Sequence, residues 1–330
     1  DFSANANPEV PEGVERVYRA AFERARTYPP EPPEAFRAAA ADYVGCEPEQ
    51  VVPTPGGLAA IRAAVALAVD EGDAALLPAP SFGEYAREVR LQGGEPSFVD
   101  AERVLDADPS GHALAVVCTP NNPTGTGYDR DALLAFARRC RAADTVLLVD
   151  EAFLGFTERA SLAGTDGVVV ARALTKLFGL PGIRAGFAVA TGDLGAALRG
   201  ARRTWNLGAP ALATGEYCLR REGFVRETRE RVRRERERLR AALGERYEVT
   251  PSEAPFLLLG VGDRDVDGVI ERARERGVAV RDARSFRGLD SHVRVAVRRP
   301  AENDRLLAAL GVGGGGEGGS DGDGGVESDV

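Results

Sequence analysis

The sequence predicts an α/β protein in which a larger domain with a mainly parallel sheet is followed by a smaller α+β domain. Between residues 40 and 210, short apolar runs alternate with stretches of helical periodicity. Several runs, such as 145–150 (TVLLVD) and 167–172 (GVVVAR), have a continuously apolar centre, which is typical of strands that helices cover on both faces. Beyond residue 215 the pattern changes to a long, highly charged helix followed by a short series of strands and helices.

The elements of the larger domain alternate as a parallel sheet requires. Helical periodicity is found at residues 57–70, 82–93 and 131–142. The runs expected to form strands are 74–79, 112–119, 145–150, 167–172 and 184–190. Because ligands of open α/β sheets bind beyond the carboxyl ends of the strands, we expect the functional residues in the loops there.

The smaller domain is expected to begin with one long helix over residues 215–243. Its arginines allow a nucleic-acid surface as an alternative, but interleaved acids and bases are more typical of a solvated helix face. The strands and helices expected after it are 256–261, 266–277, 278–282, 293–298 and 301–310. The predicted organisation is an N-terminal segment (1–35) packing with the small domain, a large domain (36–214), the small domain (215–310) and a disordered, glycine-rich tail (311–330).

Composition and charge exclude several classes of protein. The 330 residues are 44% hydrophobic and 28% charged, and no apolar run approaches the roughly 20 residues of a membrane span. No signal sequence opens the chain, so we expect a cytoplasmic protein. The net charge of −9 argues against a nucleic-acid partner. The chain has no methionine and starts at Asp1, so we expect its native start to lie upstream.

Neither a metal centre nor a histidine-based catalytic triad is predicted. The four cysteines include no Cys-x-x-Cys pair, so we expect them to be reduced, buried side chains. The two histidines, His112 and His292, lie in a turn and before a strand, away from any nucleophile motif.

The segment ARALTKLFGLPGIRAGF (171–187) holds Lys176, the only lysine among 42 basic residues. Chance could leave one lysine in an arginine-rich chain. A chemical reason is that arginine stays protonated, whereas a desolvated lysine can lose its proton and bind a carbonyl compound covalently. The same segment carries Thr175 and Arg184, and an arginine can bind phosphate through two hydrogen bonds while a threonine adds a hydroxyl.

Two loops offer groups that suit a planar, phosphorylated ligand. The segment TPGGLAAI (54–61) puts Gly56 and Gly57 at a helix start, where free N–H groups and the helix dipole attract phosphate. A plain turn before a helix is the alternative. Phe82, just beyond the strand at 74–79, can stack on a flat ring, although a core aromatic would give the same pattern.

Two more strand ends carry polar side chains. The rigid loop TPNNPTG (119–125) offers Asn122 as a hydrogen-bond donor. Asp150 ends a buried strand, where a carboxylate is costly unless it meets a cation such as a protonated pyridine nitrogen. Capping of the next turn is the alternative for this aspartate.

In this order, the loops resemble those of the fold-type-I enzymes that use pyridoxal phosphate (PLP), over residues 1–310. The segments DFSANANP (1–8), TYPPEPPEAFRAAAADYVG (27–45) and HVRVAVRRPAENDRLLAAL (292–310) look most similar to one branch of them. That branch contains histidinol-phosphate aminotransferases and L-threonine-O-3-phosphate decarboxylases. DFSANANP, VRVAVR and DEAF, with Phe153 where the aminotransferases commonly have tyrosine, resemble the decarboxylases.

The resemblance implies a fold-type-I, aminotransferase-like fold, pyridoxal 5'-phosphate as cofactor and a homodimer with shared active sites. Lys176 resembles the lysine that carries the cofactor, and Asp150 matches the partner of the pyridine nitrogen. Asn122 matches the donor to the ring's phenolic oxygen, and Phe82 the stacking aromatic.

The remaining matches concern phosphate and substrate. The positions that match the phosphate cup are Gly56, Gly57, Leu58, Thr175 and Arg184. Tyr28 resembles a tyrosine that reaches the cofactor phosphate of the neighbouring subunit. Arg294 matches the arginine that binds the substrate α-carboxylate, Arg281 is a second arginine near the substrate, and Asn122 also lies on the substrate side. Alternation with valines would equally fit an exposed strand arginine at position 294.

The activity implied is decarboxylation of L-threonine O-3-phosphate to aminopropanol phosphate in cobalamin biosynthesis. An aminotransferase acting on histidinol phosphate or another amino acid remains the nearest alternative, because only the bond broken at Cα differs. A non-catalytic PLP carrier is a further alternative, which Arg281 and Arg294 disfavour because they would serve substrate and not cofactor.

Overall fold

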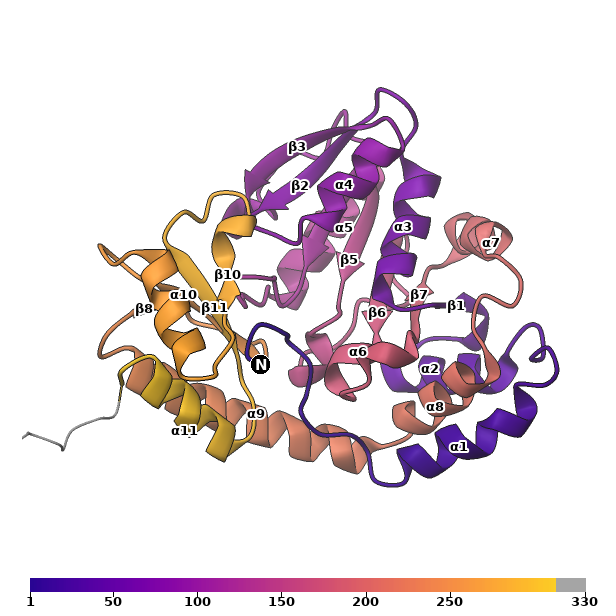
Figure 1. Cartoon of the computed structure of the whole chain (residues 1–330). Helices are drawn as coiled ribbons and strands as arrows, with labels where there is room; N and C mark the ends of the chain where they lie inside the picture. The colour runs from indigo at the N-terminus through magenta and orange to yellow at the C-terminus, as the bar shows by residue number, and fades with distance from the viewer. Residues whose placement is uncertain (313–330) are drawn as a thin grey trace, which may run out of the picture.

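The computed structural model describes residues 1–312, and its larger part is built on a seven-stranded sheet (Figure 1). The strand order is β1-β7-β6-β5-β4-β2-β3, and only β7 runs antiparallel to its neighbours. The strands, in sheet order, are β1 (Val51–Thr54), β7 (Gly186–Val189), β6 (Val168–Ala173), β5 (Val146–Asp150), β4 (Leu114–Cys118), β2 (Ala74–Ala79) and β3 (Glu95–Asp100). The fold-type-I expectation of a mainly parallel sheet is therefore confirmed.

Helices cover both faces of this sheet, because successive strand residues point to opposite sides. Leu148 belongs to one apolar core, and its neighbours Leu147 and Val149 belong to the other. The core around Leu148 is closed by α3 (Gly57–Ala68), α4 (Glu84–Leu91) and α7 (Gly192–Ala201). The opposite core is closed by α2 (Glu34–Val44), α5 (Arg130–Ala142), the short α6 (Leu174–Leu177) and α8 (Ala209–Leu219).

The two edge strands, β1 and β3, are absent from the sequence prediction. Both contain a proline, Pro53 and Pro96, which lacks the N–H that an inner strand would need. β1 is only four residues long, and β3 is half-exposed with no continuous apolar run. Short, proline-containing edges thus carry too little pattern to be recognised from the sequence.

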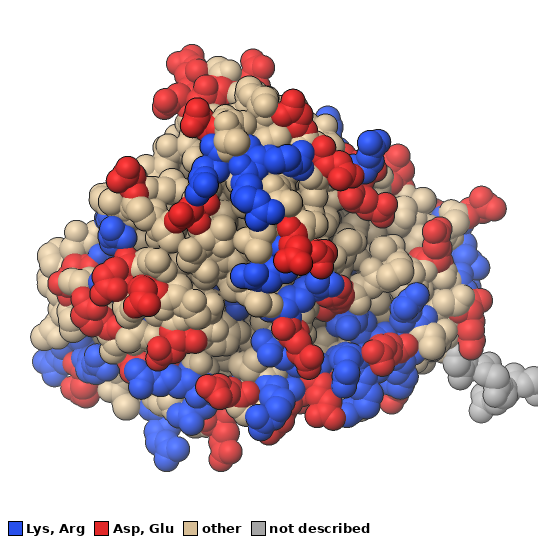
Figure 2. Space-filling view, turned by 180° about the vertical axis from the view of Figure 1, so that it is seen from behind, with Lys and Arg blue, Asp and Glu red and all other residues tan. Residues whose placement is uncertain are grey.

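The smaller part is an antiparallel four-stranded sheet in the order β10-β11-β9-β8. Its strands are β8 (Glu248–Val249), β9 (Phe256–Gly260), β10 (Arg281–Asp282) and β11 (His292–Ala296). Its helices are α9 (Glu222–Leu243), α10 (Val266–Glu275) and α11 (Pro300–Ala309). On the face shown in Figure 2, acidic and basic side chains are interleaved.

The prediction of one helix over residues 215–243 was wrong. The chain forms α8 and α9 with a break at Arg220 and Arg221, so the boundary predicted at residue 214 lies inside α8. The two helices bury their apolar faces against different partners: α8 packs on α1 (Val14–Arg24) and α2, whereas α9 packs on the small domain. Arginines are good helix formers, so nothing in their pattern marks this break.

The first residues of the chain form a strap between the two sheets, visible near the label N in Figure 1. The N–H of Phe2 bonds to the carbonyl of Ala279, and the N–H of Ala296 bonds to the carbonyl of Phe2, which ties the strap to the small sheet. The N–H of Asn7 bonds to the carbonyl of Lys176 in the larger part. The strap therefore contacts both parts, while α1 packs on α8.

The predicted tail falls mostly outside the described residues. Gly311 and Val312 are described, and Val312 is buried with its N–H bonded to the carbonyl of Leu307. Residues 313–330 lie outside the description. Among residues 1–312, none of the helices combines the length and the apolar character that crossing a bilayer would take.

Candidate active site

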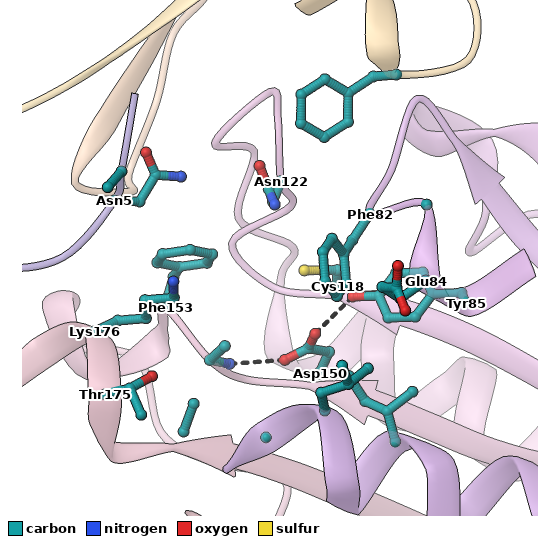
Figure 3. A pocket seen from close by; sticks show the side chains of 18 of the residues that line it. Asn5, Phe82, Glu84, Tyr85, Cys118, Asn122, Asp150, Phe153, Thr175 and Lys176 are labelled. Carbon is teal, nitrogen blue, oxygen red and sulfur yellow. Dashed lines mark hydrogen bonds between the residues drawn. The ribbon is translucent and has the colours of Figure 1, made fainter. Parts of the chain in front are cut away.

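A cavity of about 520 Å³ lies beyond the carboxyl ends of β4, β5 and β6, between the large sheet and the small domain (Figure 3). Its walls come from loops that the sequence analysis singled out and from the N-terminal strap. The lining residues are Ser3, Ala4, Asn5, Gly57, Leu58, Ile61, Phe82, Gly83, Glu84, Tyr85, Cys118, Asn122, Asp150, Ala152, Phe153, Ala173, Thr175, Lys176, Arg184, Arg281, Ser285, Phe286 and Arg294.

Asp150 ends β5 in the middle of this cavity. Its Oδ2 accepts a hydrogen bond from the hydroxyl of Tyr85 at 2.6 Å, and its Oδ1 accepts one from the N–H of Ala152 at 2.9 Å (Figure 3). Burial raises the pKa of the Asp150 carboxyl, and the Tyr85 hydrogen bond opposes this shift. Within residues 1–312 no cationic side chain forms an ion pair with it, so the site fits a ligand that brings a cation of its own.

Lys176 lies on α6, immediately after β6, with its side chain half-buried in the cavity. Burial lowers the pKa of its ammonium group, and the charges of Arg294 and Arg184 lower it further, while Asp150 acts in the opposite direction. A lysine in such surroundings gives up its proton more readily and becomes nucleophilic.

A phosphate-sized cradle lies where α3 begins. Gly56 has φ of 93°, a conformation that favours glycine, and a Cβ there would come within 2.5 Å of Nη2 of Arg184. The next residue, Gly57, starts α3 and would bring a Cβ to 3.0 Å from that of Ala173. Free N–H groups of the first helical turn, the Arg184 guanidinium and the Thr175 hydroxyl form this part of the wall.

Arg294 lies on the opposite wall. Its alternation with valines in the sequence would equally have fitted an exposed position. Arg294 is 6% exposed, and its guanidinium lies 5.2 Å from the ring centre of Phe256 and 5.5 Å from that of Phe286. It donates to Asn122 Oδ1 and to the carbonyl of Ser3, while its Nε has no hydrogen-bond partner among the described residues. Burial, with the charge of Arg281 added, lowers its pKa. Such an undercompensated cation suits an anionic ligand.

The remaining predicted residues lie around this cavity with one exception. Phe82 packs its ring edge-on against Tyr85 at 5.6 Å, and Arg281 lies exposed at the rim with Nη2 bonded to Ser285 Oγ. Tyr28 lies elsewhere: it is 77% exposed and packs at a tilt against Trp205, with 4.4 Å between ring centres.

Several lining residues were not predicted, and three of them, Ser3, Asn5 and Tyr85, bring polar groups to the cavity. Ser3 and Asn5 come from the strap, and the Oδ1 of Asn5 is buried without a partner among the described residues. The segment DFSANANP contributes to the family resemblance, but its residues alone do not indicate which side chain faces a ligand. Tyr85 lies on α4, three residues after Phe82. The sequence does not show whether its ring only packs in the core or whether its hydroxyl reaches Asp150, as it does in the structure.

The Tyr85→Phe variant is expected to weaken binding of PLP, the cofactor that the sequence resemblance implies, about tenfold. The lost bond goes to a charged carboxylate, for which roughly 1.5–3 kcal/mol is typical, and without it the pKa of Asp150 rises further. Absorbance titration of the apoenzyme with PLP measures this. Tyr128→Phe is the matched control, because this buried tyrosine donates to the carbonyl of Ala101, away from the cavity. Equal weakening in both variants would contradict the assignment.

The described residues contain no cluster of three or more histidine, cysteine or acidic side chains that could hold a metal ion. The groups that the cavity does offer are an amine able to form a covalent bond, a buried carboxylate, a phosphate cradle and an arginine that suits an anion.

Comparison with known proteins extends over almost all of the described chain. A family model described as aminotransferase class I and II matches residues 1–310. Histidinol-phosphate aminotransferase 1 of Archaeoglobus fulgidus is 31% identical over 316 residues, covering 93% of this chain and 97% of the relative. Threonine-phosphate decarboxylase of Salmonella typhimurium is 32% identical over 254 residues, covering 72% and 70%. The crystal structure of L-threonine-O-3-phosphate decarboxylase from Porphyromonas gingivalis matches with a TM-score of 0.84 at 25% identity, covering 94% and 98%.

Proposed function

Since this chain belongs to the aminotransferase class I and II family of PLP-dependent enzymes, we propose that its reaction is the decarboxylation of L-threonine O-3-phosphate. The products are carbon dioxide and aminopropanol phosphate. Relatives at about 30% identity carry either this activity or that of a histidinol-phosphate aminotransferase in their names. The proposal therefore rests on residues inside the cavity.

Phe153 is the observation that carries the choice of reaction. It is 5% exposed, lines the cavity and packs edge-on against Phe256 at 5.1 Å between ring centres. The aminotransferases of this branch commonly have a tyrosine there, so this chain lacks a hydroxyl near the reacting atoms. A second support is Arg294, whose unpartnered Nε lies beside the cavity and suits the α-carboxylate of threonine phosphate.

When bound, PLP supplies an electron sink conjugated to the substrate nitrogen, which stabilises negative charge at Cα. Lys176 would hold the cofactor through its amine, and Asp150 would keep a proton on the pyridine nitrogen. Arg294 would bind the substrate carboxylate and orient it for cleavage. On loss of carbon dioxide the bonding electron pair would stay at Cα, and Lys176, displaced by the substrate amine and protonated by the substrate ammonium group, would deliver that proton to Cα.

The substrate phosphate is assigned to the rim of the same cavity. Arg281 and Ser285 lie on one side of it, and Asn5 of the strap lies on the wall with an unpartnered side-chain oxygen. An amide can turn its NH₂ toward an anion, so Asn5 can donate to a phosphate oxygen. Two anionic groups on the substrate thus meet two arginines, Arg281 and Arg294.

One assay separates the two reactions. Incubated with L-threonine phosphate and PLP alone, the enzyme is expected to release carbon dioxide over many turnovers and to keep its pyridoxal form. An aminotransferase would stop after one half-reaction as pyridoxamine phosphate until a 2-oxo acid is added. Multiple turnover with histidinol phosphate plus 2-oxoglutarate, and none with threonine phosphate, would overturn the decarboxylase proposal in favour of the aminotransferase.

A homodimer completes the proposal, because Tyr28 cannot serve its own cavity from its exposed position on Trp205. Tyr18 and Phe22, four residues apart on α1, are also exposed, and exposed aromatic groups are typical of contact surfaces. We propose that Tyr28 reaches the cofactor phosphate of a second copy.

The Tyr28→Phe variant is expected to bind PLP several-fold more weakly while remaining dimeric and folded, because only a hydroxyl is lost. Sedimentation gives the oligomeric state, and PLP titration gives the affinity. Tyr18→Phe removes another exposed hydroxyl and serves as the control, with unchanged affinity. A fully active monomer at assay concentration would refute the shared site.

A further inference from the structure

A second cavity, of about 590 Å³, lies between α9 and the segment that follows β5. It shares no lining residue with the active-site cavity. Its lining residues are Phe156, Thr157, Glu158, Arg159, Arg226, Arg229, Glu230, Arg233, Arg236 and Glu253. Five of these are arginines and three are glutamates, in a chain whose net charge is −9. We call this cavity the arginine groove.

Four of the arginines come from one face of α9. Arg226, Arg229, Arg233 and Arg236 follow each other at intervals of three or four residues, the spacing that places side chains on the same side of a helix. Arg229 and Arg236 are half-buried, and the other two are exposed. Like charges at this spacing repel one another, so the arrangement is unfavourable for folding alone.

The contacts within the groove leave most of this charge without a partner. In the part of the chain that the structure describes, only Arg159 forms an ion pair, through Nε and Nη2 with the two carboxylate oxygens of Glu253 at 2.6 Å each. Arg229 donates from Nε to the carbonyl of Gly155 at 2.9 Å. Arg236 donates from Nη1 to the carbonyl of Glu253 at 2.8 Å.

These backbone bonds fix the two half-buried guanidinium groups from one side only. The remaining N–H groups of Arg229 and Arg236 are left for another acceptor, and the side chains of Arg226 and Arg233 have no hydrogen bonds among the described residues. Burial, together with the charge of Arg233, lowers the pKa of Arg236, while Glu237 and Glu253 oppose this. The charge of Arg236 is therefore incompletely compensated.

A neighbouring hollow of about 330 Å³ extends the same basic surface. It shares Arg159 and Arg229 with the groove and adds Arg130 to the groups that can donate hydrogen bonds. Cavities that bind small molecules typically measure roughly 300–1,000 Å³. The groove and the neighbouring hollow are each of this size and are lined by hydrogen-bond donors.

We propose that the arginine groove binds a small diphosphate-type anion, at a site separate from the active site. Guanidinium forks match phosphate oxygens in pairs, and several arginines at three- or four-residue spacing can contact two linked phosphate groups. Glu158 and Glu230 belong to the lining and disfavour a long polyanion such as nucleic acid. The only aromatic residue of the lining, Phe156, is buried, so recognition rests on the phosphates and not on a stacked base.

The groove also joins the two parts of the molecule. Arg159 follows the short helix Leu154–Phe156, which comes directly after Phe153 of the active site, while α9 belongs to the small domain. An anion held by Arg233 and Arg229 would lie beside the Arg159–Glu253 ion pair, where these two segments meet.

Calorimetric titration of the PLP-loaded enzyme with pyrophosphate tests the proposal. The parent is expected to bind one equivalent, and Arg229→Gln with Arg233→Gln to weaken binding at least tenfold. Arg234→Gln with Arg240→Gln is the matched control, because both arginines are exposed on α9 and neither lines the groove. Its affinity should stay within twofold of the parent. Arg229 also donates a hydrogen bond to the carbonyl of Gly155, so a variant of the exposed Arg233 alone is included. Arg233→Gln is expected to weaken pyrophosphate binding at least threefold and to keep the circular dichroism spectrum of the parent.

Two further arms separate this site from others. Arg294→Gln alters the active-site cavity and is expected to leave pyrophosphate binding intact. Citrate, an anion without phosphorus, is expected to bind at least tenfold more weakly than pyrophosphate. Absence of binding to the parent, equal weakening by the control pair, loss of binding in Arg294→Gln or equal affinity for citrate would each overturn the proposal.

Discussion

Lys176→Ala is expected to abolish turnover, with a loss of more than ~10⁴-fold, and to remove the visible absorbance that borohydride bleaches in the parent enzyme. The alanine variant has no amine to hold the cofactor and none to return a proton to Cα, and acid–base catalysis alone is typically worth ~10²–10⁴-fold. Absorbance spectra and carbon dioxide release measure the two effects.

The chain offers an unusually clean readout for this experiment because Lys176 is its only lysine. Borohydride reduction of the PLP-loaded parent should label one peptide, the one that contains Lys176. Lys176→Arg is the informative companion variant, since it keeps a positive charge but cannot supply a neutral amine at ordinary pH. Labelling at the α-amine with Lys176 untouched would refute the cofactor assignment.

Arg294→Ala is expected to lower kcat/KM for L-threonine phosphate by about 10²–10³-fold while the spectrum of the bound cofactor survives. The side chain is buried with an unpartnered Nε, and removing one member of a buried, hydrogen-bonded charge pair typically costs ~2–5 kcal/mol. In the proposed mechanism the loss would arise because Arg294 no longer orients the substrate carboxylate for cleavage. Steady-state kinetics and PLP titration check the two halves of this expectation.

Arg281→Ala distinguishes the two arginines. Arg281 is exposed at the rim and bonds to Ser285, so its loss should mainly raise KM, whereas the loss of Arg294 should also lower kcat. If Arg294→Ala released the cofactor as well, its effect would have to be assigned to the cavity wall rather than to the substrate carboxylate.

The sequence singled out several residues that the structure places at one cavity. Asp150 stood out as a carboxylate that ends a buried strand, and Lys176 as the only lysine of the chain; the parallel strands bring both to one edge of the sheet. Gly56 was singled out because a glycine pair before a helix has a specific physical use.

The parts of the site that could not be predicted from the sequence depend on tertiary packing. Asn5 faces the cavity only because the strap pairs with Ala279 and Ala296, residues more than 270 positions away. Arg294 becomes buried because Phe256 and Phe286 close over it, although its alternation with valines resembles an exposed strand. Local periodicity contains no information about such distant partners.

The N-terminal strap has a practical consequence for anyone who makes this protein. Its residues are hydrogen-bonded to the small sheet at Phe2 and to the backbone of Lys176 at Asn7, and Ser3 accepts a bond from Arg294. Residues fused ahead of Asp1 would therefore lie close to the cavity, and a protease that cleaves the strap would disconnect the small sheet from Lys176. Preparations should be checked by intact mass before a low specific activity is attributed to a mutation.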